Sequence, residues 1–286
     1  MITLIKRNLR LFFRDKAGVF FSLLAVLITI VLYMFFVSEI LLPDELKSLP
    51  SSEIVKASWI ASGLLTTASI TTTLGAAGVM INDRVRNIEK DFRASPVSPR
   101  ALTGGYLLST FAVGVLMTTV TFALSIAYII SKGGSVPPFD DILKVLGIIL
   151  LSVFAGTAIV TFIVSFLNSN NAFIAANTVV GTLIGFMTGI FIPIGVLPDA
   201  VQNAVRAFPL THAASLFRKV LVDAPMSDMF ADAPTGLMSE FQELMGITLK
   251  FGDNEVSTST AILILLATAA GFYGLSLANM SRRSKL

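Results

Sequence analysis

The sequence contains no cysteine and a single histidine, His212. Without cysteine the chain can form neither disulfide bonds nor thiolate metal sites. A lone histidine outside the long apolar segments offers little for nucleophilic catalysis, which needs a base held by a hydrogen-bonded partner. Neither a G-x-S-x-G nor an H-E-x-x-H motif occurs. These absences argue against an enzyme, and we interpret His212 as structural or solvated.

Charge is also scarce. Charged residues make up 14% of the chain and hydrophobic residues 54%, and the mean hydropathy is +0.81. Crossing the roughly 30 Å hydrocarbon core of a bilayer takes about 20 helical residues, and six apolar segments are long enough. They are Val19–Ser38, Ala57–Ile81, Ala101–Ser131, Ile142–Leu167, Ala172–Gly195 and Ser257–Met280. None shows the two-residue alternation of a β-barrel, so the sequence predicts an all-α membrane protein with six transmembrane helices.

Lysine and arginine are concentrated at one set of membrane edges. Most of the 21 lie in the first 16 residues, between residues 84 and 100, or after residue 281. With six spans these regions share one side, which the positive-inside rule makes cytoplasmic. We therefore expect a multi-pass protein of the cell membrane with both termini in the cytoplasm and no signal peptide. Because the basic residues sit at membrane edges, the pI of about 9.2 gives no reason to expect a nucleic-acid partner.

Residues 1–16 predict an amphipathic helix. Its apolar face would carry Ile2, Ile5, Leu9, Phe12 and Phe13, and its flank Lys6, Arg7, Arg10 and Arg14. Such a helix lies in the membrane interface, with its apolar face in lipid and its basic side toward anionic head groups. The plainer alternative is a basic anchor beside the first span.

A charged stretch separates the second and third apolar segments. On a helix over residues 83–94, Val85, Ile88 and Phe92 form one apolar stripe, and charged side chains cover the remaining surface. Pro96 follows the end of this helix. Because a turn between antiparallel spans needs only a few residues, we predict a docking surface for a soluble partner, with Phe92 as its anchor. A solvated cytoplasmic loop is the alternative.

The outer part of the chain follows the fifth apolar segment, where Pro193 and Gly195 are expected to break the helix. Pro198 then begins an amphipathic helix too short to span the membrane, and we expect it half-buried at the outer surface. Residues 198–256 are predicted to form this re-entrant helix and a small acidic cap. We interpret Trp59, at the outer end of the second segment, as an interfacial anchor.

Two of the apolar segments carry small or polar faces. The second is rich in hydroxyl side chains, including Thr66 and Thr73. The fifth has a stripe at four-residue steps, formed by Asn177, Gly181, Gly185, Gly189 and Pro193. Small residues allow helices to approach closely, and hydroxyls can hydrogen-bond across the contact. Packing within one subunit is the plain interpretation of both faces.

The apolar segments contain no Asp, Glu or His, and their only ionisable residue is Lys144, near the start of the fourth. Ion-coupled transporters commonly carry such groups at mid-membrane, where a charge costs about 2.5–3.5 kcal/mol. Their absence argues against ion coupling and for an external energy source. No G-x-x-x-x-G-K-[ST] motif occurs, so any ATP hydrolysis must come from another polypeptide.

This organisation resembles that of the type-2 ABC export permeases. The shared features are a basic amphipathic N-terminal helix, six spans, a charged helix between the second and third, and a proline-broken segment after the fifth. The local run from Asp83 to Tyr106, DRVRNIEKDFRASPVSPRALTGGY, looks like the cytoplasmic signature of that family. The likeness extends over essentially the whole chain.

The resemblance implies a membrane-spanning permease subunit that exports a hydrophobic or amphipathic compound, such as a drug, a peptide or a lipid-like molecule. It implies two protein partners: a separate ATPase, which would hold the ATP and Mg²⁺, and a second permease subunit, the same or homologous. No cofactor is expected in this chain. An ion-coupled secondary transporter and a non-transporting membrane sensor subunit are the alternatives.

The same resemblance assigns roles to particular residues. The residues implied to dock the ATPase are Arg84, Val85, Ile88, Glu89, Lys90, Asp91, Phe92 and Arg93. Those implied to border the dimer axis or the translocation path are Thr66, Thr73, Asn177, Gly181, Gly185, Gly189 and Pro193.

Overall fold

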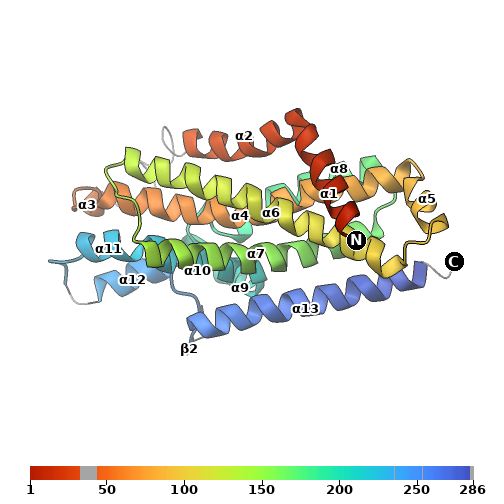
Figure 1. Ribbon diagram of the computed structural model, residues 1–286. Helices are drawn as coiled ribbons and strands as arrows, with labels where there is room; N and C mark the ends of the chain where they lie inside the picture. Colours follow the sequence, from red (N-terminus) through yellow and green to blue (C-terminus); the bar gives the residue numbers. More distant parts are fainter. Residues whose placement is uncertain (33–43, 235, 253, 284–286) are drawn as a thin grey trace.

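A computed structural model of the chain describes residues 1–32, 44–234, 236–252 and 254–283. The protein is an elongated bundle of helices that run side by side (Figure 1). Its longest helices are α4 (Ser52–Val85), α6 (Pro99–Ser131), α7 (Phe139–Phe166) and α13 (Thr258–Arg283). Each of the four is long and apolar enough to cross a membrane, and together they cover the second, third, fourth and sixth predicted segments. The chain is an all-α membrane protein.

The other two predicted segments coincide with shorter helices. α2 (Lys16–Leu32) covers most of the first segment, whose last part, 33–38, lies outside the described residues. α8 (Asn170–Met187) has 18 residues and is therefore about 27 Å long. The prediction that Pro193 and Gly195 end this helix was wrong. The chain turns at Gly189, where φ is +68°, a left-handed conformation that glycine adopts readily after a helix C-terminus.

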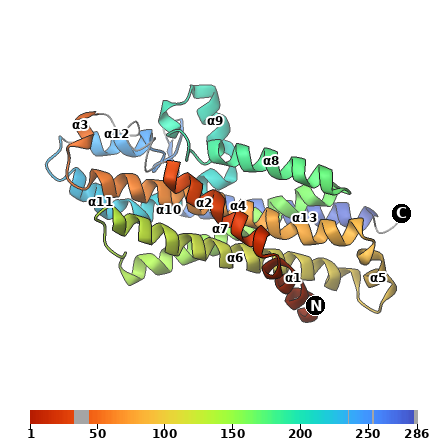
Figure 2. The same ribbon diagram turned by 90° about the horizontal axis from the view of Figure 1, so that it is seen from above.

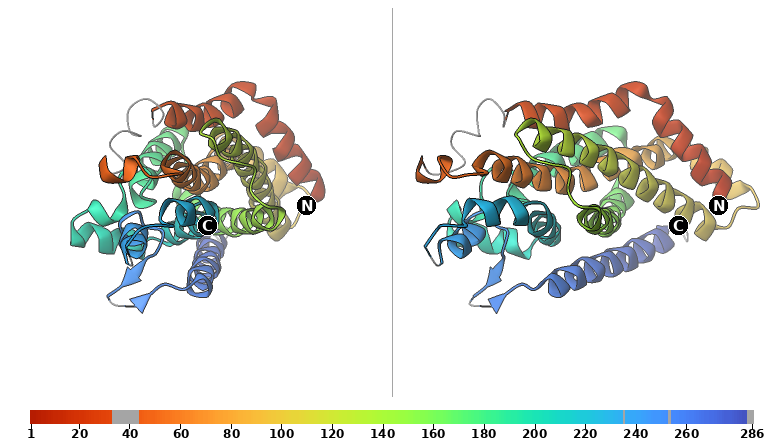
Figure 3. Two further views of the ribbon diagram at one scale, coloured as in Figure 1. Left: turned by 90° about the vertical axis from the view of Figure 1, so that its left-hand side faces the viewer. Right: turned by 60° about the vertical axis from the view of Figure 1, so that its left-hand side comes forward.

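α4 is the central helix of the bundle. It packs against α2, α6, α7, α8 and α10. In its 18-residue apolar stretch 78% of the residues are buried, compared with 22% in that of the peripheral α13. Figure 3, which looks along the bundle, shows the other helices around it. The hydroxyls of Thr66 and Thr73 bond back to carbonyls of their own helix rather than across a contact. Glycines of the facing helices allow the close approach: a Cβ on Gly156 would lie 3.2 Å from the Ser69 carbonyl oxygen.

The two ends of the bundle differ (Figures 1 and 2). One end carries the described termini together with α1 (Ile2–Arg14) and α5 (Ile88–Ala94). The opposite end carries short elements, which are α3 (Asp44–Lys47), η2 (Ile194–Val196), α9 (Asp199–Ala207), α10 (Pro209–Leu221), α11 (Asp223–Met229), α12 (Leu237–Leu244) and the hairpin of β1 (Lys250–Phe251) and β2 (Asn254–Glu255).

α10 belongs to the bundle, although the sequence placed it in the outer cap. Residues 210–218 are all buried, because α10 packs against α4, α7 and α13. His212 is among them, with Nε2 3.0 Å from the Arg206 carbonyl oxygen. Burial lowers the pKa of His212, and this hydrogen bond opposes part of the shift. The residue is therefore held inside the fold.

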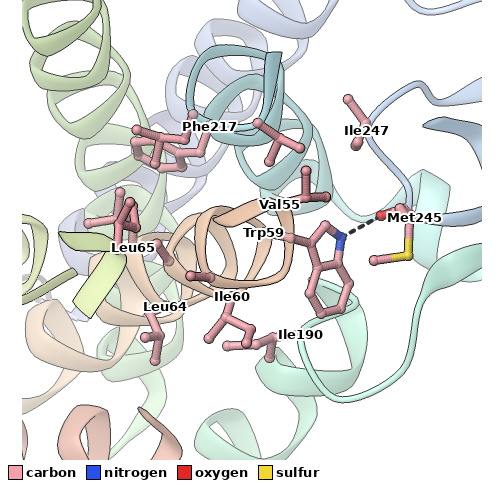
Figure 4. Packing of buried hydrophobic residues seen from close by; sticks show 14 of the residues in the cluster. Val55, Trp59, Ile60, Leu64, Leu65, Ile190, Phe217, Met245 and Ile247 are labelled. Carbon is pink, nitrogen blue, oxygen red and sulfur yellow. Dashed lines mark hydrogen bonds between the residues drawn. The ribbon is translucent and has the colours of Figure 1, made fainter. Parts of the chain in front are cut away.

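Trp59 is not the interfacial anchor that the sequence suggested, because it is fully buried (Figure 4). Its indole Nε1 donates to the Met245 carbonyl at 2.8 Å, and the Arg218 guanidinium lies 4.7 Å from the ring centroid. Arg218 also donates to the carbonyls of Thr188 and Gly189, at the C-terminal end of α8, where a cation is favourable. The contact joins α4, α8, α10 and the segment after α12.

Candidate functional site

Asp83 is the buried centre of the site at the α1–α5 end. Its carboxylate, near the end of α4, receives two hydrogen bonds from the Arg7 guanidinium, at 2.5 and 2.7 Å. A third comes from the Tyr106 hydroxyl at 2.6 Å. Asp83 is only 3% exposed, and a carboxylate is buried at tolerable cost only when paired and hydrogen-bonded. This one group therefore ties α1, α4 and α6 together.

The sequence placed Arg7 on the basic flank of α1, toward the lipid head groups, and this placement was wrong. The hydrogen bond to Asp83 raises the pKa of Arg7, so the guanidinium stays charged. The neighbouring Asn8 is also turned inward, with its Nδ2 donating to the Ser109 hydroxyl at 3.1 Å. Arg7 points inward because the buried carboxylate of Asp83 requires a cation. Ile2 and Phe13 keep exposed apolar surface on the outer side of α1.

The predicted helix over 83–94 is two pieces. α4 continues to Val85, and the chain then turns through Arg86 and Asn87 before α5 begins at Ile88. Asn87 has φ +60°, a conformation that asparagine tolerates better than most residues. The result is a corner rather than a straight rod. Its exposed surface, the α4–α5 corner, consists of Val85, Arg86, Asn87, Lys90 and Asp91.

The remaining predicted docking residues contact their own chain. Phe92 is half-buried, with the Arg7 guanidinium 5.3 Å from its ring centroid, and Ile88 is half-buried as well. Arg84 donates to the carbonyls at the end of α7, including that of Leu167 at 2.5 Å, and forms an ion pair with Glu89 at 3.3 Å. The Arg93 side chain lies outside the described residues. The corner is thus fixed to α1 through Phe92 and to α7 through Arg84.

A cavity of about 460 Å³ adjoins Asp83, between α1, α2, α4 and α8. Its polar end holds Arg7, Asp83 and Arg86, and its less polar walls include Gly75 and Phe173. The face of α4 that lines it also carries Thr72 and Gly78. Thr66 and Thr73 are buried and are not among the residues that line this cavity.

The stripe predicted on the fifth segment is not a continuous contact within this subunit. Asn177 is exposed, and a Cβ on Gly181 would meet nothing within 4 Å. Gly185 is covered by the ring of Phe191, Gly189 lies in the turn after α8, and Pro193 is half-buried. α8 packs along α4 at the edge of the molecule (Figure 2).

Arg7 and Tyr106 are the site residues that the sequence did not identify. Nothing in the sequence distinguished Arg7 from the other basic residues on the flank of α1. Tyr106 offered one signal, because it is one of two tyrosines in the predicted third span.

The arrangement defines a helical membrane protein with a charged, exposed corner that is joined to α1 and α7. The family model described as ABC-2 type transporter matches residues 1–222 of the chain, which include α1, the α4–α5 corner and α8. The chain belongs to the ABC-2 type transporter family. A search of curated proteins gives no significant match.

Replacement of Asp83 by Asn should weaken the attachment of α1. The amide keeps the shape of the side chain but leaves Arg7 without its counter-ion, and we expect a loss of about 1–3 kcal/mol in stability. Thermal unfolding of the purified chain in detergent measures the effect, with exposed Asp91→Asn as the matched control. In a double-mutant cycle with Arg7→Gln, the two losses should be clearly less than additive. Additive losses would contradict the pairing.

Proposed function

We propose that this ABC-transporter permease subunit exports a hydrophobic or amphipathic compound, driven by ATP hydrolysis on a separate subunit. Family membership supports the permease role. The absence of a phosphate-binding G-x-x-x-x-G-K-[ST] motif from the sequence supports the separate ATPase. The observation that carries the proposal is the α4–α5 corner, whose exposed charges and one apolar side chain suit a soluble partner.

In this proposal the α4–α5 corner receives the movement of the ATPase and passes it to the membrane subunit. Val85, which is 42% exposed, would be the apolar anchor, with Lys90 and Asp91 setting its register. Phe92 would transmit rather than dock, because its ring lies against Arg7. Movement of α5 would then pass to α1 through Phe92, to α6 through Asp83 and Tyr106, and to α7 through Arg84. Ion pairs and hydrogen bonds with fixed geometry serve as stiff links of this kind.

The membrane placement follows from the same arrangement. α2 and α8 would complete six spans, and the basic α1 and α4–α5 corner would lie on the cytoplasmic side of the cell membrane, with both termini. α9 and α10 would be re-entrant from the outer side. ATP and Mg²⁺ would be bound by the partner ATPase.

A second permease subunit, the same or homologous, would cover the free side of α8. That side presents exposed apolar side chains, which are Ile174, Val179, Leu183 and Phe186. The cavity beside α4 would then face the subunit boundary. Its polar end and less polar walls would suit a compound with both a polar and an apolar part.

Val85→Asp should abolish association with the ATPase while leaving membrane insertion intact. The substitution places a charge where the anchor is expected to be desolvated. Co-purification of a nucleotide-binding subunit with the tagged chain from native membranes is the measurement. Val136→Asp is the matched control, because Val136 is also exposed but belongs to the connection between α6 and α7, which lies at the opposite end of the bundle. Undiminished co-purification with Val85→Asp would refute the docking assignment.

Gly181→Leu should disrupt the dimer without disturbing the protomer. A Cβ at Gly181 meets nothing within 4 Å in its own chain, so a loss of association reflects a neighbouring subunit. Gly271→Leu in α13 is the control, because its surroundings are equally open. Cross-linking in membranes should show at least a tenfold lower dimer fraction for Gly181→Leu alone. Equal dimer fractions in both variants would place the α8 stripe in lipid.

A further inference from the structure

A second cavity, of about 440 Å³, lies on the far side of the bundle from α8. It is bounded by α7, α10 and α13, which pack against one another at the end that carries the hairpin (Figure 1). Its lining includes Lys144 and Gly147 of α7, Leu216 and Lys219 of α10, and Ile262 of α13. None of them belongs to the site around Asp83.

The floor of this cavity is apolar. Leu216 is buried beneath it, and Ile262 is 37% exposed at its wall. Gly147 leaves the backbone of α7 bare, because a Cβ there would meet nothing within 4 Å. Both α7 and α13 are long and apolar enough to cross a membrane, so the floor lies within reach of hydrocarbon. An apolar space of this volume is within the range of small-molecule sites.

Charges of both signs gather at the rim. The Lys144 ammonium is 2.8 Å from an Asp141 carboxylate oxygen, and the Lys219 ammonium is 3.5 Å from one of Glu255. Each of the two ammonium groups at the rim therefore has a carboxylate beside it, so the charges around this opening are balanced.

We propose that this cavity binds one phospholipid whose head group carries both a phosphate and a primary ammonium group. The acyl chain would lie along Gly147 and Leu216. The phosphate would accept charge-assisted hydrogen bonds from Lys144 and Lys219, whose long side chains reach the polar edge of the membrane. The head-group ammonium would donate to the surrounding carboxylates, which would repel a net-negative head group.

The proposal goes beyond the export function and depends only on α7 and α13 crossing the membrane. Such a lipid would connect the peripheral α13 to α10. The site would therefore keep its occupant whether or not the chain transports a lipid-like compound.

The test is native mass spectrometry of the full chain. The chain is reconstituted in nanodiscs that contain equal amounts of phosphatidylethanolamine and phosphatidylglycerol with identical acyl chains, and is then released into mild detergent. The wild type should retain one phosphatidylethanolamine per protomer. Gly147→Phe should fill the cavity, since a Cβ at Gly147 meets nothing within 4 Å, and should lower the lipid-bound fraction at least tenfold. Gly271→Phe, equally open but on the part of α13 that does not line the cavity, should retain the lipid.

Two further variants keep the test decisive if Gly147→Phe is poorly folded. Ile262→Phe fills the cavity from the facing helix and should also lower retention. The double variant Lys144→Gln with Lys219→Gln leaves the floor of the cavity intact. It should weaken lipid retention, because it removes both phosphate partners. Undiminished retention in the filling variants, or preferred retention of phosphatidylglycerol by the wild type, would overturn the proposal.

Discussion

The structure depends on a carboxylate buried at the end of its central helix. Asp83 is only 3% exposed, and an unpaired charge at such a position would be costly. The three hydrogen bonds from Arg7 and Tyr106 offset that cost, and they also determine how α1 and α6 are oriented around α4. Because Phe92 lies against Arg7, the position of α5 follows from the same group. A local electrostatic requirement thus sets the geometry of the whole α1–α5 end.

Arg218 has a comparable role at the opposite end. It lies against Trp59 of α4 and binds the last carbonyls of α8, so that the chain leaves the helix at Gly189 and returns through α9 and α10. α4 therefore carries a buried charged contact near each end, and between them the hydroxyls of Thr66 and Thr73 are hydrogen-bonded inside the helix. A central helix held in this way is suited to transmit a displacement along its length, because neither end can slide independently of its neighbours.

The sequence predicted well what local patterns determine. The apolar segments, the amphipathic character of α1 and α9, and the family signature around the α4–α5 corner are all local. The orientation of single side chains is not, because it depends on partners far along the chain: 76 positions separate Arg7 from Asp83, and 186 separate Trp59 from Met245. For this reason Phe92 was read as an outward anchor and Trp59 as an interfacial residue. Gly189 is a signal for the end of α8 that the sequence contains. The predicted end lay too far along the chain, because it was placed at the two later helix breakers, Pro193 and Gly195.

Energy coupling is the central claim, and vectorial transport tests it most directly. Inside-out vesicles containing the chain and its co-purified ATPase would be incubated with a fluorescent amphipathic cation, and its accumulation inside the vesicles would be measured. Accumulation should require ATP and should persist when ionophores collapse the proton and sodium gradients. Accumulation driven by a gradient alone, with no nucleotide present, would contradict the account and favour an ion-coupled secondary transporter.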